Sequence, residues 1–199
     1  MRIILIHGYK GSPQSNFFPW LHDRLKDLGH EVIAPALPNP AEPDPEAWTK
    51  TLLEEVGPLN DETVIFGHSL GGAATLLFLE AAEARSTPKG VVLSSAPWHI
   101  RHERFSGFFT SELEYDVLPW KAHEFVVVHA QDDDVVPFDH GQKYAKLLKA
   151  KLIAPETGGH FDDPEQPVIL EAIKAVIDSP VVYEPGMSLD DDYQDLIER

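Results

Sequence analysis

Residues 64–72 read Val-Ile-Phe-Gly-His-Ser-Leu-Gly-Gly, and small and apolar residues at helical spacing follow them. An apolar run that ends in Gly-x-Ser-x-Gly and passes into a helix predicts a strand, a tight turn and a helix, with Ser69 at the apex. Gly67 and Gly71 leave room there, since a Cβ at either position would clash across the turn. The start of the helix would direct free N–H groups and the positive end of its dipole toward an oxyanion formed on an acyl group attacked by Ser69.

The pentapeptide alone is a modest signal, because glycine and serine are also common in ordinary turns. A plain loop is therefore the alternative interpretation of this stretch. The apolar strand before Ser69 and the helix after it favour the interpretation that Ser69 is a nucleophile.

The length and composition are typical of one globular domain that buries a hydrophobic core. The chain has 199 residues, of which 43% are hydrophobic and 25% charged; this length and balance are ordinary for a folded domain. No apolar run approaches the length of a membrane span, and the first residues do not form a signal peptide, so we expect a cytoplasmic protein. There are no cysteines, which excludes disulfides, thiolate catalysis and zinc bound by cysteine.

The charge excludes further classes of partner. The net charge of −17 would repel phosphate backbones and anionic membranes, so we expect neither nucleic acid nor a membrane as partner. We expect a small-molecule acyl substrate instead. Part of the acidic charge lies in residues 179–199, a tail that is either disordered or docks as a short amphipathic helix.

Predicted strands and helices alternate along the chain. The strands are predicted at residues 2–6, 31–34, 63–66, 90–94, 125–129 and 151–154, and the helices at 17–28, 45–56, 70–85, 138–148 and 167–177. Alternation of this kind predicts an α/β protein with a six-stranded, mostly parallel sheet and helices on both faces. We assign this domain to residues 1–178, followed by the acidic tail.

Two irregular segments interrupt this pattern. Prolines at positions 35, 38, 40, 43 and 45 predict an extended connector; a domain linker is the alternative, but the two strands before it could not form a core. Residues 95–121 are rich in aromatic side chains and are predicted to form one or two short helices over the site. Those aromatic side chains either line an acyl pocket or belong to the core.

A serine nucleophile needs a base, and the position of His160 selects it among the ten histidines. Ligands of parallel sheets bind at the carboxyl ends of the strands, and His160 lies at such an end in a Gly-Gly-His-Phe turn. Histidine is suited to general base catalysis because it titrates near neutrality. His129, in a strand, and His140, on a helix, are interpreted as structural residues.

The carboxylate that orients the base is expected in the loop after the fifth strand, where Asp132, Asp133 and Asp134 are all candidates. Calcium binding is an alternative, but contiguous aspartates lack the alternate spacing of an EF-hand loop. The backbone N–H groups of Leu70 and Tyr9 are predicted to form the oxyanion hole.

A metal site is a second alternative, at residues 99–103. His99 and His102 are three residues apart and could share a helix face. No third ligand is obvious, and the stretch lacks the His-Glu-x-x-His pattern of a helical zinc site.

Four motifs together resemble the small serine hydrolases of the retinoblastoma-binding and YdeN-like family. They are His7-Gly8-Tyr9-x-Gly11-Ser12-Pro13 with Phe18-Pro19-Trp20-Leu21, Gly67-His68-Ser69-Leu70-Gly71-Gly72, Asp132-Asp133-x-Val135-Val136-Pro137 and Gly158-Gly159-His160-Phe161. The resemblance covers roughly residues 1–177 and leaves the acidic tail outside.

The resemblance implies a compact α/β-hydrolase with six parallel strands that cleaves small esters or related acyl compounds without a cofactor. In this family the triad aspartate precedes the loop proline by four positions, which implies Asp133, with Ser69 and His160 completing the triad. The animal member binds retinoblastoma protein through a Leu-x-Cys-x-Glu motif, and this chain has no cysteine, so that partner is not expected.

Two further interpretations of function stay open. The chain could be a binding module on a hydrolase scaffold, because a fold does not fix a function. It could also be a thioesterase, peptidase or acyltransferase, since the same triad serves each of these reactions.

Overall fold

The six predicted strands form one fully parallel sheet in the computed structural model, which describes residues 1–110 and 113–180. The strands are β1 (Arg2–Ile6), β2 (Glu31–Ile33), β3 (Thr63–His68), β4 (Gly90–Ser94), β5 (Phe125–Val128) and β6 (Lys151–Ile153), in the order β2-β1-β3-β4-β5-β6. Every pairing between neighbours is parallel. The predicted fold class is therefore confirmed. Most of the acidic tail predicted at residues 179–199 lies outside the described residues.

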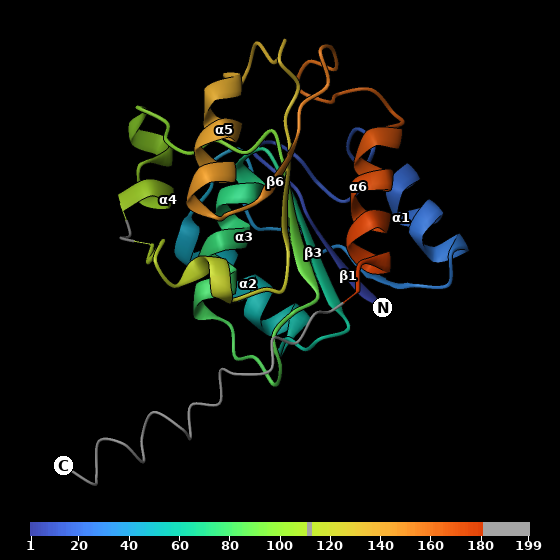
Figure 1. Cartoon of the computed structure of the whole chain (residues 1–199). Helices are drawn as coiled ribbons and strands as arrows, with labels where there is room; N and C mark the ends of the chain where they lie inside the picture. Colours follow the sequence, from blue (N-terminus) through green and yellow to red (C-terminus); the bar gives the residue numbers. More distant parts are fainter. Residues whose placement is uncertain (111–112, 181–199) are drawn as a thin grey trace, which may run out of the picture.

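Helices cover both faces of the sheet (Figure 1). One face carries α1 (Phe18–Asp27) and α6 (Pro167–Asp178), and the other carries α2 (Pro45–Val56), α3 (Leu70–Ala81) and α5 (Phe138–Leu147). The connection from β4 to β5 contains the short elements η1 (Glu103–Phe105), α4 (Gly107–Thr110) and η2 (Leu118–Trp120). The sequence predicts one or two short helices for residues 95–121, and the described residues there form three short helical elements.

The strands are apolar on both sides because both faces of the sheet are covered. In β1, Ile3 and Leu5 belong to the core layer under α1 and α6, whereas Ile4 and Ile6 belong to the layer under α2 and α3. The alternation follows from the two-residue period of a strand. It explains why this strand reads as an unbroken apolar run.

From β1 the chain first adds β2 on one side and then adds β3 to β6 on the other, and this change of direction determines where the site lies. A right-handed crossover from β1 back to β2 puts α1 on one face, while the crossovers from β2 to β3 and from β3 to β4 put α2 and α3 on the other. The loops after β1 and β3 therefore leave the sheet toward opposite faces and open a crevice between them. Tyr9 and Ser69 lie in these two loops.

One helix boundary differs from the prediction. The sequence predicts that the helix after Ser69 reaches about Arg85, but α3 ends at Ala81 and Ala82 is extended. Residues 82–85 instead pair with the chain at Leu59, whose N–H donates to Glu83 O while Arg85 N–H donates to Leu59 O. Tertiary pairing thus overrides the local helix preference of this segment.

The predicted N-cap of α2 is confirmed. Asp44 caps α2, its side chain accepting a hydrogen bond from Ala47 N–H at 2.7 Å. Phe108, from the aromatic segment, is buried against Trp48 in the core. In the described part of the chain, no helix is long and apolar enough to cross a bilayer.

Candidate active site

Ser69 lies on a sharp turn between β3 and α3. Its backbone has φ of 54° and ψ of −131°, in the left-handed region that residues other than glycine rarely adopt. A Cβ on Gly71 would lie 2.3 Å from the carbonyl oxygen of Ile6, and one on Gly67 would lie 2.3 Å from Thr75 Oγ1. Both glycines are therefore required by close packing around the turn, as the sequence predicts.

The imidazole of His160 lies next to the hydroxyl of Ser69, although the two residues are 91 positions apart in the chain. His160 lies in the loop between β6 and α6, and its Nε2 is 3.0 Å from Ser69 Oγ. The Nδ1 atom of the same ring is 3.0 Å from Asp133 Oδ2 and 3.2 Å from Oδ1. The structure thus brings together hydroxyl, imidazole and carboxylate in one row of hydrogen bonds.

Asp133 is fully buried yet stays charged. Burial alone would raise the pKa of this carboxyl group, but hydrogen bonds from His160 and from Val136 N–H lower the pKa to about 2. Its Oδ1 accepts from the N–H groups of Val135 and Val136 at 3.0 and 2.8 Å. The buried Ser95 hydroxyl also helps to lower this pKa, although its geometry falls short of a hydrogen bond.

The two neighbouring aspartates take other positions. Asp132 Oδ1 accepts a hydrogen bond from Gly159 N–H at 2.8 Å, which ties the loop after β5 to the loop that carries His160. Asp134 is exposed. Of the three candidate carboxylates, Asp133 is the one that reaches the imidazole.

The predicted oxyanion donors belong to two loops that touch. A Cβ on Gly8 would lie 2.9 Å from Ser69 Cβ and 3.2 Å from Leu70 N, so the loop after β1 packs directly on the turn. Within the described chain, the N–H groups of Tyr9 and Leu70 donate to no other residue. Both are free to bind an oxyanion, and that role stays a prediction.

The aromatic segment contacts this site through Tyr9. Arg104 Nη1 donates a hydrogen bond to Tyr9 Oη at 2.8 Å, and the Phe105 ring packs edge-on against the Tyr9 ring. Arg104 also forms an ion pair with Glu42 at 3.2 Å. The element η1 therefore holds the loop that carries a predicted oxyanion donor.

A small cavity opens beside Ser69. Its volume is about 80 Å³, and it is lined by the loop after β1, the start of α1, His68, Ser69, His160 and Asp162. Asn16 Nδ2 donates to Asp162 Oδ1 at 2.9 Å on the wall of this cavity. Of the two alternatives for the aromatic side chains of residues 95–121, a lining of this cavity finds no support, because none of them is among its described lining residues.

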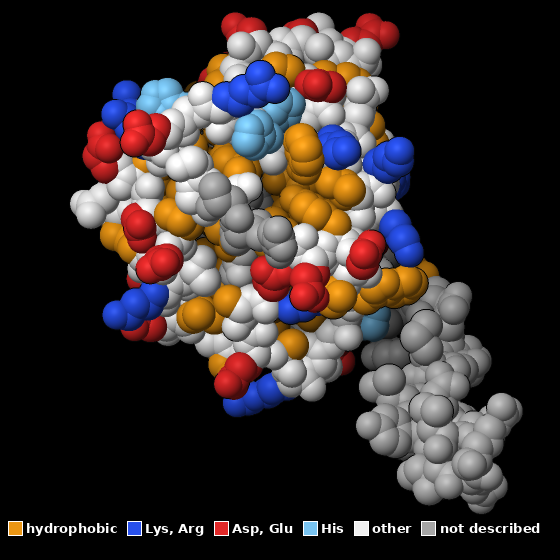
Figure 2. All heavy atoms as spheres, turned by 90° about the vertical axis from the view of Figure 1, so that its left-hand side faces the viewer, with side chains coloured by type: hydrophobic (Ala, Val, Ile, Leu, Met, Phe, Trp, Pro, Cys, Tyr) orange, Lys and Arg blue, Asp and Glu red, His pale blue; other side chains and the backbone are white. Residues whose placement is uncertain are grey.

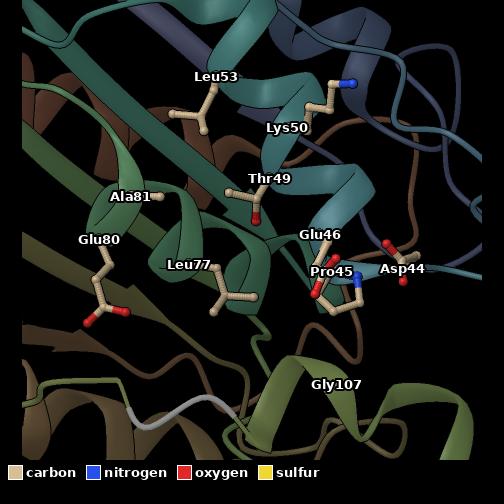
Figure 3. Close-up of a pocket in the computed structure, with 10 residues that line it drawn as sticks. All are labelled: Asp44, Pro45, Glu46, Thr49, Lys50, Leu53, Leu77, Glu80, Ala81 and Gly107. Carbon is tan, nitrogen blue, oxygen red and sulfur yellow. The ribbon is translucent and has the colours of Figure 1, made fainter.

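A much larger groove lies elsewhere, between α2, α3 and Gly107 (Figure 3). It has a volume of about 860 Å³, and Thr49, Leu53 and Leu77 are among its lining residues. Figure 2 shows apolar side chains gathered over the middle of the face on which α4 lies. The groove contains neither serine nor histidine among its described lining residues, so it offers no counterpart to the Ser69–His160 pair.

The alternative metal site has no support in the geometry. His102 Nδ1 accepts a hydrogen bond from Arg104 N–H at 3.2 Å. Across residues 1–110 and 113–180, no three histidine, aspartate or glutamate side chains converge in a way that could hold a metal ion.

Two buried histidines at this site make contacts that sequence reasoning does not find, although it interprets His129 as a structural residue. His68 Nε2 lies 2.9 Å from the carbonyl oxygen of His160, and His129 Nε2 lies 2.8 Å from that of Val136. The partner of His68 is 92 residues away in the chain, so no local pattern could reveal the contact.

Comparisons with known proteins agree with this architecture. The family model described as "Serine hydrolase" matches residues 3–179. YdeN of Bacillus subtilis is 31% identical over 166 residues, which cover 82% of this chain and 87% of YdeN. The serine hydrolase RBBP9 of Rattus norvegicus is 22% identical over 177 residues, covering 87% of this chain and 89% of that protein.

Solved structures show the same fold. The crystal structure of the B. subtilis ydeN product has a TM-score of 0.83 at 27% identity and covers 89% of this chain and 99% of that one. Est1E from Butyrivibrio proteoclasticus, at 16% identity and a TM-score of 0.66, covers 87% of this chain and 85% of its own, and shows likeness of fold alone. With a family match over nearly the whole length and the YdeN likeness in sequence and structure, the chain belongs to the serine hydrolase family.

Proposed function

We propose that this serine hydrolase cleaves short-chain carboxylic esters through an acyl-enzyme, with Ser69 as nucleophile, His160 as base and Asp133 as the residue that orients the base. The observation that carries the proposal is the row of hydrogen bonds from Ser69 Oγ through both ring nitrogens of His160 to Asp133. A serine hydroxyl is a weak nucleophile unless such a base adjoins it.

In the acylation step, Ser69 Oγ attacks the carbonyl carbon of the ester while His160 Nε2 takes the hydroxyl proton. The ionised Asp133 accepts a hydrogen bond from His160 Nδ1 and stabilises the imidazolium ion that forms. His160 then gives the proton to the leaving alcohol as the carbon–oxygen bond breaks. The N–H groups of Tyr9 and Leu70 bind the oxyanion of the tetrahedral intermediate.

In the deacylation step, His160 removes a proton from water, which attacks the acyl carbon of the ester formed with Ser69. The proton returns to Ser69 Oγ as the carboxylic acid leaves. Water supplies the only co-reactant, so no step requires a cofactor.

The size of the cavity supports a short acyl group. About 80 Å³ beside Ser69 holds only a few atoms, given that one water molecule occupies about 30 Å³ in the liquid. Ser12, Ser15 and Asn16 make part of its wall polar. A long alkyl chain would find neither the volume nor the apolar surface that it needs there.

Hydrolysis of p-nitrophenyl acetate, butyrate and palmitate by the wild-type protein and Ser69→Ala tests the proposal. We expect the acetate and butyrate esters to be cleaved faster than palmitate, and Ser69→Ala to lower kcat by at least about 10³-fold. Ser86→Ala is a matched control, because Ser86 is an exposed serine in the segment before β4, at the opposite end of the parallel strands from the loops that carry Ser69 and His160.

The experiment tests the nucleophile and the preference for short acyl chains separately. Equal activity of Ser69→Ala and wild type would refute the nucleophile, whereas faster cleavage of palmitate would refute only the preference for short chains. Running thioesters and peptides of the same acyl groups in parallel distinguishes an esterase from the thioesterase and peptidase alternatives. Absence of cleavage across the whole panel would favour a binding module.

A further inference from the structure

The two triad loops each rest on a buried histidine that the proposed reaction does not use. His68, the last residue of β3, contacts the loop that carries His160, and His129, the residue after β5, contacts the loop that carries Asp133. His68 is 5% exposed and His129 is 0% exposed. Buried polar side chains of this kind cost stability unless hydrogen bonds satisfy them.

The contact of His68 fixes the backbone of the base itself. Its Nε2 is 2.9 Å from His160 O, and a carbonyl oxygen can only accept, so the His68 Nε2 carries the proton and donates. The ring is held in place by the edge of Phe17, with ring centroids 5.2 Å apart, and lies 5.0 Å from the His160 ring. His68 is also the residue directly before Ser69, so one side chain links the nucleophile turn to the base loop.

The contact of His129 supports the loop segment that holds Asp133. His129 Nε2 donates to Val136 O at 2.8 Å, and the N–H of the same Val136 donates to Asp133 Oδ1 at 2.8 Å. The imidazole also lies 3.5 Å from Asp133 Oδ2. Packing against α5 fixes the ring further, since a Cβ on Gly141 would lie 2.6 Å from His129 Nδ1.

Both imidazoles are neutral in the folded protein. Burial, together with the positive charge that His160 can acquire, lowers the pKa of His68 to about 3. Burial also lowers the pKa of His129, so its approach to Asp133 is not an ion pair at neutral pH. A neutral ring with hydrogen on Nε2 can act as a fixed donor without adding charge beside the reacting groups.

We propose that His68 and His129 are positioning residues for the triad: their Nε2–H groups hold the carbonyl oxygens of His160 and Val136 and thereby set the places of the base and the acid. The proposal rests on the proposed function. Catalysis depends steeply on such placement, because a shift of about 1 Å in a reacting group can cost about 10²-fold in rate.

Paired substitutions separate the hydrogen bond from the packing of the ring. His68→Gln keeps an N–H donor but loses the ring, whereas His68→Phe keeps a ring against Phe17 but loses the donor. We expect His68→Phe to lower kcat at least about tenfold with KM within about threefold, and His68→Gln to retain kcat within about threefold. At position 129 we likewise expect His129→Gln, which keeps an N–H donor, to retain a higher kcat than His129→Leu, which does not.

A purely structural role predicts the reverse order at His68, since the variant that preserves packing would then be the more active one. If the phenylalanine variant matches or exceeds the glutamine variant in kcat, the inference is overturned. Thermal unfolding of each variant ensures that kcat is compared between folded proteins.

If a variant does not fold, a measurement on the wild-type protein still tests whether the histidine at that position donates through Nε2. Nitrogen NMR of protein labelled with ¹⁵N-histidine reports which ring nitrogen carries the proton at neutral pH. We expect neutral rings protonated at Nε2 for His68 and His129; protonation at Nδ1 alone would overturn the role of that residue. An inactive wild type would refute the proposed function itself, whereas an active wild type with unimpaired His68→Phe refutes only the positioning role.

Discussion

At the scale of single residues, burial lowers the proton affinity of three histidines near the site, His7, His68 and His129. The pKa of His68 falls from 6.5 to about 3, chiefly because burial disfavours the charged ring, and burial lowers the pKa of His7 and His129 as well. Asp133 behaves in the opposite sense, because hydrogen bonds keep it ionised despite its burial. Asp133 is therefore a fixed negative charge beside these neutral buried rings.

The lowered pKa of His68 predicts a loss of stability in mild acid. Between pH 6.5 and about 3, the unfolded chain binds a proton at His68 that the folded protein does not bind. The free energy of unfolding must therefore decrease as the pH falls through this window. For one such group the decrease between pH 7 and pH 5 is on the order of 2 kcal/mol.

Urea unfolding of wild type and His68→Gln at both pH values measures this effect. The decrease should be smaller in the glutamine variant, because its side chain does not titrate while the other histidines are common to both proteins. An identical decrease in the two proteins would show that His68 binds its proton equally well when folded and unfolded.

At the scale of elements, the cap of α2 offers a test that is independent of the site. Asp44 Oδ1 accepts a hydrogen bond from Ala47 N–H, and Pro45 follows as the first helical residue. Asp44→Ala should lower the free energy of unfolding by about 1 kcal/mol and leave kcat unchanged, since α2 carries none of the three proposed catalytic side chains. Chemical denaturation together with an esterase assay provides both measurements.

The matched control is Asp44→Asn, which keeps a side-chain oxygen that can accept the same hydrogen bond. It should retain most of the stability. Equal destabilisation by alanine and asparagine would mean that the charge of Asp44, acting on the helix dipole, contributes more than the cap hydrogen bond.

Sequence patterns predict the elements well where local preference and tertiary packing agree. The unbroken apolar run of β1 predicts a strand covered on both faces, and the structure confirms it. The end of α3 could not be predicted, because residues 82–85 favour a helix locally and are diverted by pairing with Leu59. Leu59 lies in the loop between α2 and β3, distant in the chain from residues 82–85, so hydrophobic periodicity does not reveal the pairing.

The same distinction applies to the site. Glycines around Ser69 and before His160 mark tight turns at strand ends, and these marks suffice to predict that the two residues approach each other. Choosing Asp133 from three adjacent aspartates required the family resemblance, because spacing alone does not say which carboxylate is buried. The contacts of His68 and His129 join their side chains to backbone carbonyl oxygens, and the sequence, which indicates only a structural role for His129, does not reveal either contact.

At the scale of the whole molecule, the sheet brings together loops from three different strands. Ser69 follows β3, Asp133 follows β5 and His160 follows β6, and parallel pairing places all three loops at one edge. Ser69 N–H donates to Ser94 O at the end of β4, so the strand between β3 and β5 also ties the turn to this edge. The net charge of −17 predicts that neutral substrates will be preferred over anionic ones.

The most direct test of the proposed nucleophile is the site at which a fluorophosphonate probe modifies the native protein. Peptide mapping by mass spectrometry should find the phosphonyl group on Ser69 alone, because among the described serines its hydroxyl is the one hydrogen-bonded to an imidazole. Heat-unfolded protein should remain unlabelled. Labelling of Asp133→Asn should be slowed by orders of magnitude, since the imidazole loses its orienting carboxylate. Native protein that stays unmodified at Ser69, or that is labelled equally well after unfolding, would contradict the account.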